Sequence, residues 1–165
     1  MQELQNLTKG NYVLILHLDE EKSIEIGSLG KFRFSKGYYA YVGSAFNNGG
    51  LAARITHHMT SSDKPHWHID YLNKHAELKE VWLAETATNL EHKWADLMLA
   101  MPEGIFFING FGSSDCNCIG HLFYFREKPS LDSFRKHAGH SAGRKRIEIK
   151  GIKMKLKSDL ILSEA

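Results

Sequence analysis

An arginine and a histidine are spaced so that they could act on the same group of a substrate. Arg54 and His58 stand four positions apart in a segment where Leu51 and Ile55 recur at the spacing of one helical face. Side chains four residues apart on a helix lie side by side, so we expect both to project from the face opposite those apolar residues. Cutting a phosphodiester bond needs positive charge where the phosphoryl group gathers negative charge, and a group that moves a proton. This pair can supply both.

Two cysteines and a histidine form a second group that could do chemistry. Cys116, Cys118 and His121 fall close together, and thiolate and imidazole are the preferred ligands of Zn²⁺. Packing of unreactive thiols in the core is the alternative, because free cysteine often behaves as a small apolar residue. A disulfide across one intervening residue would be strained, which favours reduced thiols in a cytoplasmic protein. Candidates for a fourth zinc ligand are His66, His68, His92 and Asp115.

The elements that must position Arg54 and His58 can be predicted from the residues before them. Aromatic and β-branched residues at 37–43 indicate a strand, which runs into a small, polar, glycine-rich turn before the helix. Upstream, 12–18 is nearly continuously apolar, as expected of a central strand covered on both faces. The segment 24–34 alternates around a glycine-containing turn and predicts a β-hairpin. Three or four antiparallel strands therefore precede the helix.

The second half of the chain predicts further helices and strands. An amphipathic helix that ends at Pro102 is indicated by the spacing of Leu90, Trp94, Leu97, Met98 and Met101. The other expected elements are a short helix within 66–75, strands at 80–84, 105–108 and 122–125, and a helix at 130–137 that is capped by Ser130 and closed by Gly139.

The C-terminal segment is basic and alternates between apolar and charged residues. Ile147 and Ile149 share one face, and Ile152, Met154 and Leu156 share one as well. Gly151 shifts the apolar positions by one residue, which predicts a bulge or a bend there.

Composition is compatible with a single domain that spans residues 1–165. The net charge is only +2, so affinity for nucleic acid would have to come from local clusters of basic residues. No apolar run approaches the roughly 18 residues of a membrane span, so we expect no membrane partner. The predicted elements indicate an α+β fold with a small antiparallel or mixed sheet flanked by helices, and with an inserted β-hairpin.

Several short motifs occur in an order that resembles the GIY-YIG nuclease superfamily. They are Gly10-Asn11-Tyr12, Tyr41-Val42-Gly43, the helix with Arg54 and His58, HWHIDYL at 66–72 and GFGSSDCNCIGHLFYF at 110–125. The last two are similar to a largely prokaryotic branch of small stand-alone proteins. The resemblance covers a core at 10–125 and leaves 126–165 as a C-terminal extension with a helix and a basic strand. The hairpin departs from the superfamily pattern, and either Tyr12 or an aromatic such as Tyr38 or Tyr39 could face the site.

The resemblance implies a metal-dependent endonuclease that hydrolyses phosphodiester bonds in DNA. In that reading Arg54 stabilises the charge on the phosphoryl group, Tyr12 or Tyr41 lies close to the attacking water, and His58 helps to move a proton. Glu91 falls on the position of the metal-binding acid and would hold one Mg²⁺ or Mn²⁺ ion, because hard oxygen ligands suit these cations. No small-molecule cofactor is expected. Residues expected to contact the substrate are Gly43, Ser44, His66 and His68.

Other interpretations of the same residues remain open. Thr88 and Glu91 have the spacing of a capping box, in which the carboxylate bonds to the Thr88 amide and does no chemistry. The whole protein could be a nucleic-acid-binding module that has kept this fold and does not cleave. It could also be a structural or interaction protein that is stabilised by zinc.

The basic C-terminal segment generates a first prediction. Replacing Lys153, Lys155 and Lys157 by Gln should flatten the slope of log affinity for duplex DNA against log salt concentration by roughly 0.9 per lost phosphate contact. The preferred sequence or structure should not change. An unchanged slope together with stronger aggregation would show instead that these lysines protect a strand edge. Binding titrations at several salt concentrations provide the measurement.

Overall fold

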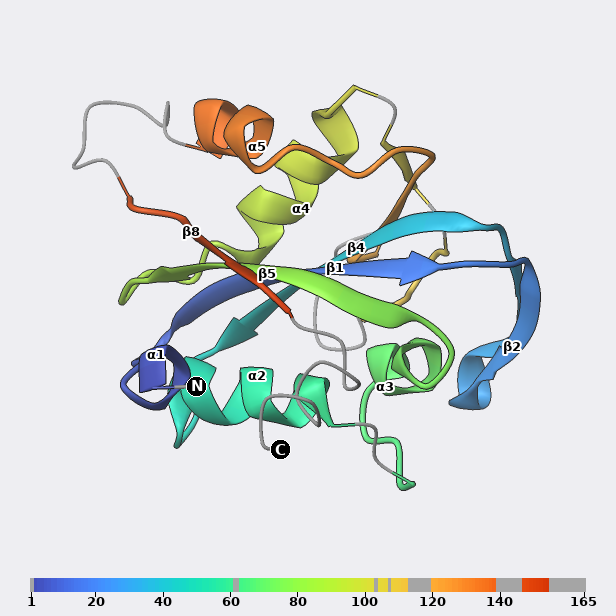
Figure 1. Ribbon diagram of the computed structural model, residues 1–165, viewed down its shortest axis with the longest axis horizontal. Helices are drawn as coiled ribbons and strands as arrows, with labels where there is room; N and C mark the ends of the chain where they lie inside the picture. The colour runs from blue at the N-terminus through green and yellow to red at the C-terminus, as the bar shows by residue number, and fades with distance from the viewer. Residues whose placement is uncertain are drawn as a thin grey trace, which may run out of the picture.

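The central strand of the sheet is β1 (Gly10–Leu18), which lies between β4 (Gly37–Ala45) and β5 (Glu77–Glu85) in the computed structural model (Figure 1). Both pairings are antiparallel, and all of β1 except His17 is buried. A strand that is hydrogen-bonded on both edges and covered on both faces has a nearly continuous apolar sequence, as residues 12–18 do. The residues that the structure describes are 2–60, 63–102, 104–106, 108–112, 120–138 and 147–154.

The predicted α+β fold with an antiparallel sheet is confirmed. Within the described residues the main sheet has six strands in the order β6-β7-β4-β1-β5-β8, and every pair is antiparallel. The outer strands are β6 (Ile105–Phe106), β7 (Leu122–Phe125) and β8 (Lys150–Lys153). The predicted hairpin is also confirmed, as the separate pair β2 (Lys22–Ile26) and β3 (Gly30–Phe34), which a single turn of 3₁₀ helix connects.

Helices cover both faces of the main sheet (Figure 1). One face carries α1 (Gln2–Gln5), α2 (Gly50–Met59) and α3 (His68–Asn73), and the other carries α4 (Glu91–Ala100) and α5 (Leu131–Ala138). Neighbouring residues of β1 therefore point into different cores, with Tyr12 and Leu14 in the first and Val13 and Ile15 in the second. None of the helices that the structure describes has the length and apolar character needed to cross a membrane.

The bulge predicted at Gly151 is wrong. The register between β5 and β8 is regular through this residue, with Val81 opposite Ile152 and Trp82 opposite Gly151. Residues of odd and even number lie on opposite faces of a strand. Ile147 and Ile149 therefore belong to one core and Ile152 and Met154 to the other without any shift in register. Leu156 lies outside the described residues. A Cβ at Gly151 would lie 2.5 Å from Cδ2 of Leu131, so a larger residue there would require that side chain to move.

The predicted start of α5 is confirmed, since the Ser133 amide donates to the Ser130 hydroxyl at 3.3 Å. Gly139, which should close this helix, lies outside the described residues. The basic segment 144–146 and the lysines at 155 and 157 also lie outside them, whereas Lys153 is exposed on β8.

A buried asparagine joins the central strand to α4. Asn11 is 0% exposed, and its Nδ2 donates to the Thr88 carbonyl while its Oδ1 accepts from the Leu90 amide, each at 3.0 Å. Leu90 is the residue that precedes the helix, so the amide bonded to Asn11 is one that the helix itself cannot satisfy. Asn11 thereby fixes the position of the first helical residue, Glu91, relative to β1.

This connection generates a stability prediction. Asn11→Ala should lower the free energy of unfolding by about 2–4 kcal/mol, because it removes both hydrogen bonds of a fully buried side chain and leaves two partly buried backbone groups without their partner. Asn89→Ala is the matched control, since Asn89 is exposed and its Oδ1 accepts from the Glu91 amide. The control should cost no more than about 1 kcal/mol. Urea denaturation of both variants provides the comparison, and equal losses would contradict a special role for Asn11.

Candidate functional site

A tyrosine of the central strand is hydrogen-bonded to a histidine of α2. The Tyr12 hydroxyl lies 2.8 Å from Nε2 of His58, and the two residues are 1% and 2% exposed. The Tyr41 ring on the neighbouring strand approaches the same imidazole, with a distance of 6.4 Å between ring centroids. Tyr38 and Tyr39 do not join them, because Tyr38 packs on His17 and the Tyr39 hydroxyl donates to the Ser35 carbonyl.

The expected orientation of His58 is wrong. Instead of projecting from the face opposite Leu51 and Ile55, it lies on the same buried face of α2 as these residues. Position 58 follows 55 by three and 51 by seven, and these spacings return to one side of a helix. Arg54 lies at the margin of this face and is half-buried.

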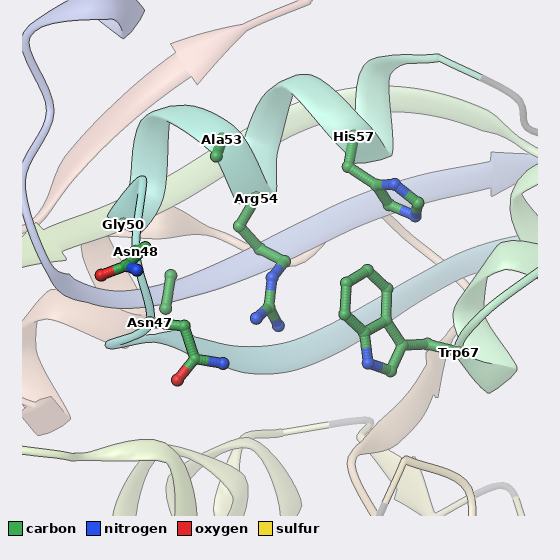
Figure 2. Close-up of a pocket in the computed structure, with 8 residues that line it drawn as sticks. Asn47, Asn48, Gly50, Ala53, Arg54, His57 and Trp67 are labelled. Carbon is green, nitrogen blue, oxygen red and sulfur yellow. The ribbon is translucent and has the colours of Figure 1, made fainter.

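Arg54 is held in place but remains reachable. One of its guanidinium nitrogens donates to the Ser44 carbonyl at 3.3 Å, and its Cζ lies 4.3 Å from the centroid of the Trp67 ring. Figure 2 shows the guanidinium between Asn47 and Trp67. It borders a hollow of about 210 Å³ that is also lined by Ala45, Asn47, Asn48, Gly50, Ala53, His57 and Trp67. A cation stacked on an indole face and bonded on one side keeps further N–H donors for a ligand.

Glu91 points to the same region. Its Oε2 accepts from the Ser44 hydroxyl at 3.1 Å, and its Oε1 lies 3.3 Å from Nδ1 of His121. The capping-box interpretation is wrong, because Glu91 is itself the first helical residue and the Thr88 amide donates to the Thr86 hydroxyl. The carboxylate is 19% exposed. Ser44 thus connects the two charged residues, by its carbonyl to Arg54 and by its hydroxyl to Glu91.

Burial dominates the electrostatics of the buried aromatic groups. It lowers the pKa of His58 from 6.5 to about 3, and the nearby Asp70 carboxylate opposes this only in part. Burial likewise raises the pKa of Tyr12 and of Tyr41, and the Arg54 guanidinium offsets each change only in part. At neutral pH the hydrogen bond therefore joins a neutral phenol to a neutral imidazole.

The other residues that the sequence analysis singled out as site candidates do not all lie beside Arg54 and Glu91. Nδ1 of His68 accepts from the Gly112 amide at 3.0 Å, so this side chain ties α3 to the segment around Phe111. His66 is exposed and its ring lies against Trp67. At Gly43 a Cβ would lie 2.4 Å from the Tyr12 ring, so the glycine makes room for that ring. Cys116 and Cys118 lie outside the described residues, and His121 faces Glu91.

Two residues of this region were not singled out from the sequence. Asp70 is buried, and its Oδ2 accepts from the amides of His66 and Trp67 at 2.8 and 2.9 Å. Its Oδ1 lies 3.0 Å from Nε2 of His57. The available signal was the position of Asp70 in the first turn of α3, where a carboxylate commonly accepts from free amides. The partner His57 could be found only from the tertiary structure.

A comparison with protein-family models shows the family of this chain. The model for the domain of unknown function DUF123 matches residues 11–144. The chain belongs to this family. Neither the curated proteins nor the solved structures contain a match. The matched region begins at Asn11 and includes all of the site residues described above.

The buried imidazole generates a prediction about pH. The pKa of His58 is lower in the folded protein than in the unfolded chain, so the unfolded state binds this proton first as the pH falls. Above pH 6.5 the imidazole is neutral in both states, and the stability that depends on neutral His58 is fully present. As the pH falls from 6.5 to about 3, the free energy of unfolding decreases by up to about 1.4 kcal/mol per pH unit. In metal-free buffer, His58→Gln should therefore flatten the dependence of unfolding free energy on pH in this range.

The matched control is His137→Gln, which replaces an exposed histidine of α5. Chemical denaturation at several pH values between 4.5 and 7 gives the slope for each protein. Parallel curves for the parent protein and His58→Gln would contradict the assigned effect of burial.

Proposed function

We propose that this protein is a metal-dependent endonuclease that hydrolyses phosphodiester bonds in DNA. The observation that carries the proposal is the meeting of Arg54 and Glu91 at Ser44. A cationic donor and a partly exposed carboxylate on two separate helices are thereby held at one point, beside the strands that carry Tyr12 and Tyr41. Phosphodiester hydrolysis needs these two charges in one place, the first for the phosphoryl group and the second for a cation.

Arg54 would bind the phosphoryl group of the substrate. Its contacts with the Ser44 carbonyl and the Trp67 ring fix the guanidinium and leave other N–H donors available. A planar guanidinium can donate to two phosphate oxygens at once. Because it is oriented before the substrate arrives, it needs little rearrangement as negative charge gathers on those oxygens.

Tyr12 and His58 would move the proton of the attacking water. The water gives its proton to the Tyr12 oxygen as the phenolic proton passes to Nε2 of His58, so that neither a free phenolate nor a lost proton is required. Burial disfavours the resulting imidazolium in the free protein. A bound phosphate close by would favour it, because an opposite charge raises the pKa of an imidazole.

Glu91 would hold the divalent cation. The partly exposed carboxylate and the Ser44 hydroxyl are hard oxygen donors, which fits Mg²⁺ or Mn²⁺ with water and phosphate as its other ligands. When bound, such a cation supplies positive charge to the phosphate and to the leaving oxygen.

A nucleic-acid-binding module without cleavage is the second candidate. It is favoured by the burial of the Tyr12 and His58 side chains, because a water molecule must reach the Tyr12 hydroxyl for the relay to operate. Arg54, which lines the open hollow, could still bind a phosphate without chemistry.

A cleavage assay over single-stranded, duplex, flap and branched DNA separates the two candidates. The parent protein should cut at least one of these substrates with Mg²⁺ or Mn²⁺ and none with a chelator present. Arg54→Ala should lower the rate by about 10² or more, as expected for the loss of one preorganised charge-stabilising group. Glu91→Gln should lower the rate measured with Mg²⁺ or Mn²⁺ to that of the parent protein in the presence of a chelator.

Two surface variants provide the matched controls. Arg33→Ala removes an exposed arginine of the hairpin that pairs with Glu21, and Glu77→Gln removes an exposed carboxylate that pairs with Lys79. Both should retain the parent rate. Binding without cleavage for every substrate would support the second candidate, and an unchanged rate in Arg54→Ala would exclude this residue from the reaction.

A further inference from the structure

Three side chains that bridge α2 and α3 are arranged like the ligands of a metal ion. His57, His58 and Asp70 each offer a donor atom, and these atoms all lie within 4.8 Å of one another. Glu91, the expected ligand of Mg²⁺, is not among them and instead contacts Ser44 and His121. The group therefore does not include the carboxylate that serves the proposed nuclease reaction, but it shares His58 with the proposed proton relay.

Two of the three donors are already fixed in position. Oδ2 of Asp70 accepts from two backbone amides, which sets the orientation of the carboxylate and leaves Oδ1 beside Nε2 of His57 at 3.0 Å. Oδ1 of Asp70 is thus held beside His57, where it can serve as a ligand together with that imidazole.

The third donor has an unsatisfied polar atom. His58 is 2% exposed, Tyr12 occupies its Nε2, and its Nδ1 has no hydrogen-bond partner among the described residues. A buried polar atom without a hydrogen-bond partner destabilises the folded state, and a bound ligand would remove that cost.

We propose that Nε2 of His57, Nδ1 of His58 and Oδ1 of Asp70 bind a divalent transition-metal ion, foremost Zn²⁺. Two imidazole nitrogens and one carboxylate oxygen are a common set of protein ligands for zinc, whereas Mg²⁺ prefers oxygen ligands alone. His57 also lines the hollow beside Arg54 and Trp67, so one of the three proposed ligands can be reached from that hollow.

Binding of the ion would change the hydrogen bond at the buried tyrosine. A metal on Nδ1 of His58 places the ring proton on Nε2, which then donates to the Tyr12 oxygen and cannot accept a proton from it. The proton relay of the proposed nuclease reaction therefore belongs to the protein without an ion on His58. The phenolic proton of Tyr12 becomes available to another acceptor. The ion would also join α2 to α3, since His58 and Asp70 belong to different helices.

Metal binding to the full chain without a histidine tag tests the proposal. The protein is stripped with a chelator and dialysed against Zn²⁺, and in parallel titrated with Co²⁺, whose visible absorption reports coordination. We expect one equivalent of bound ion and an absorption spectrum without thiolate-to-metal bands. His57→Ala and the milder His57→Gln should each weaken binding by at least about tenfold, while circular dichroism confirms that they are folded.

Two further variants decide between this site and the other candidates. Glu91→Gln and the double variant Cys116→Ser, Cys118→Ser should both bind the ion as the parent protein does. Absence of binding in the parent protein would overturn the proposal, as would loss of binding in either of these variants or its retention in both His57 variants. Because the readout is bound metal, the site can be confirmed even if the protein cleaves no DNA.

Discussion

The structure depends on the burial of β1 on both faces and between two strands. Adjacent residues of such a strand must point to opposite sides, and Asn11 and Tyr12 show the consequence. Asn11 fixes the beginning of α4 on one side, and Tyr12 is bonded to α2 on the other. Two neighbouring residues thereby position both helices that carry the charged groups of the candidate site. A shift of one residue in the register of β1 would exchange them and destroy both connections.

The candidate site combines deep burial with polar side chains, and this combination has an energetic cost. Tyr12 and His58 satisfy each other in part, and Asp70 is satisfied by backbone amides and His57. The packing around them is tight, as the small space between Gly43 and the Tyr12 ring indicates. Polar groups that are retained in a core at such a cost commonly serve a function, because apolar residues of similar size would pack there with less penalty.

Much of the fold could be predicted from local patterns, but much of the site could not. The run at 12–18 and the spacing of Leu90 and Trp94 predicted a central strand and a helix, because burial imposes its period on the sequence. Glu91 matched a capping box equally well, and only its place as the first residue of α4 and the bond of the Thr88 amide to Thr86 exclude that interpretation. Local spacing shows which residues can meet on one element, whereas contacts between elements depend on how those elements pack. The pairing of His57 with Asp70 across two helices is of that kind.

The order of the strands has a consequence for folding during synthesis. The central strand β1 precedes every other strand of the main sheet, yet β5, which covers its second edge, follows only after α2 and α3, and β8 follows only after α5. On the ribosome the apolar run of β1 can pair first with β4, through a connection that the hairpin β2–β3 already folds upon itself. Its other edge must wait for β5, and such non-local pairing is slow. Until β5 pairs with it, the second edge of this strongly apolar strand is exposed and can associate with other unfolded chains. This protein should therefore depend on chaperones while it is being made.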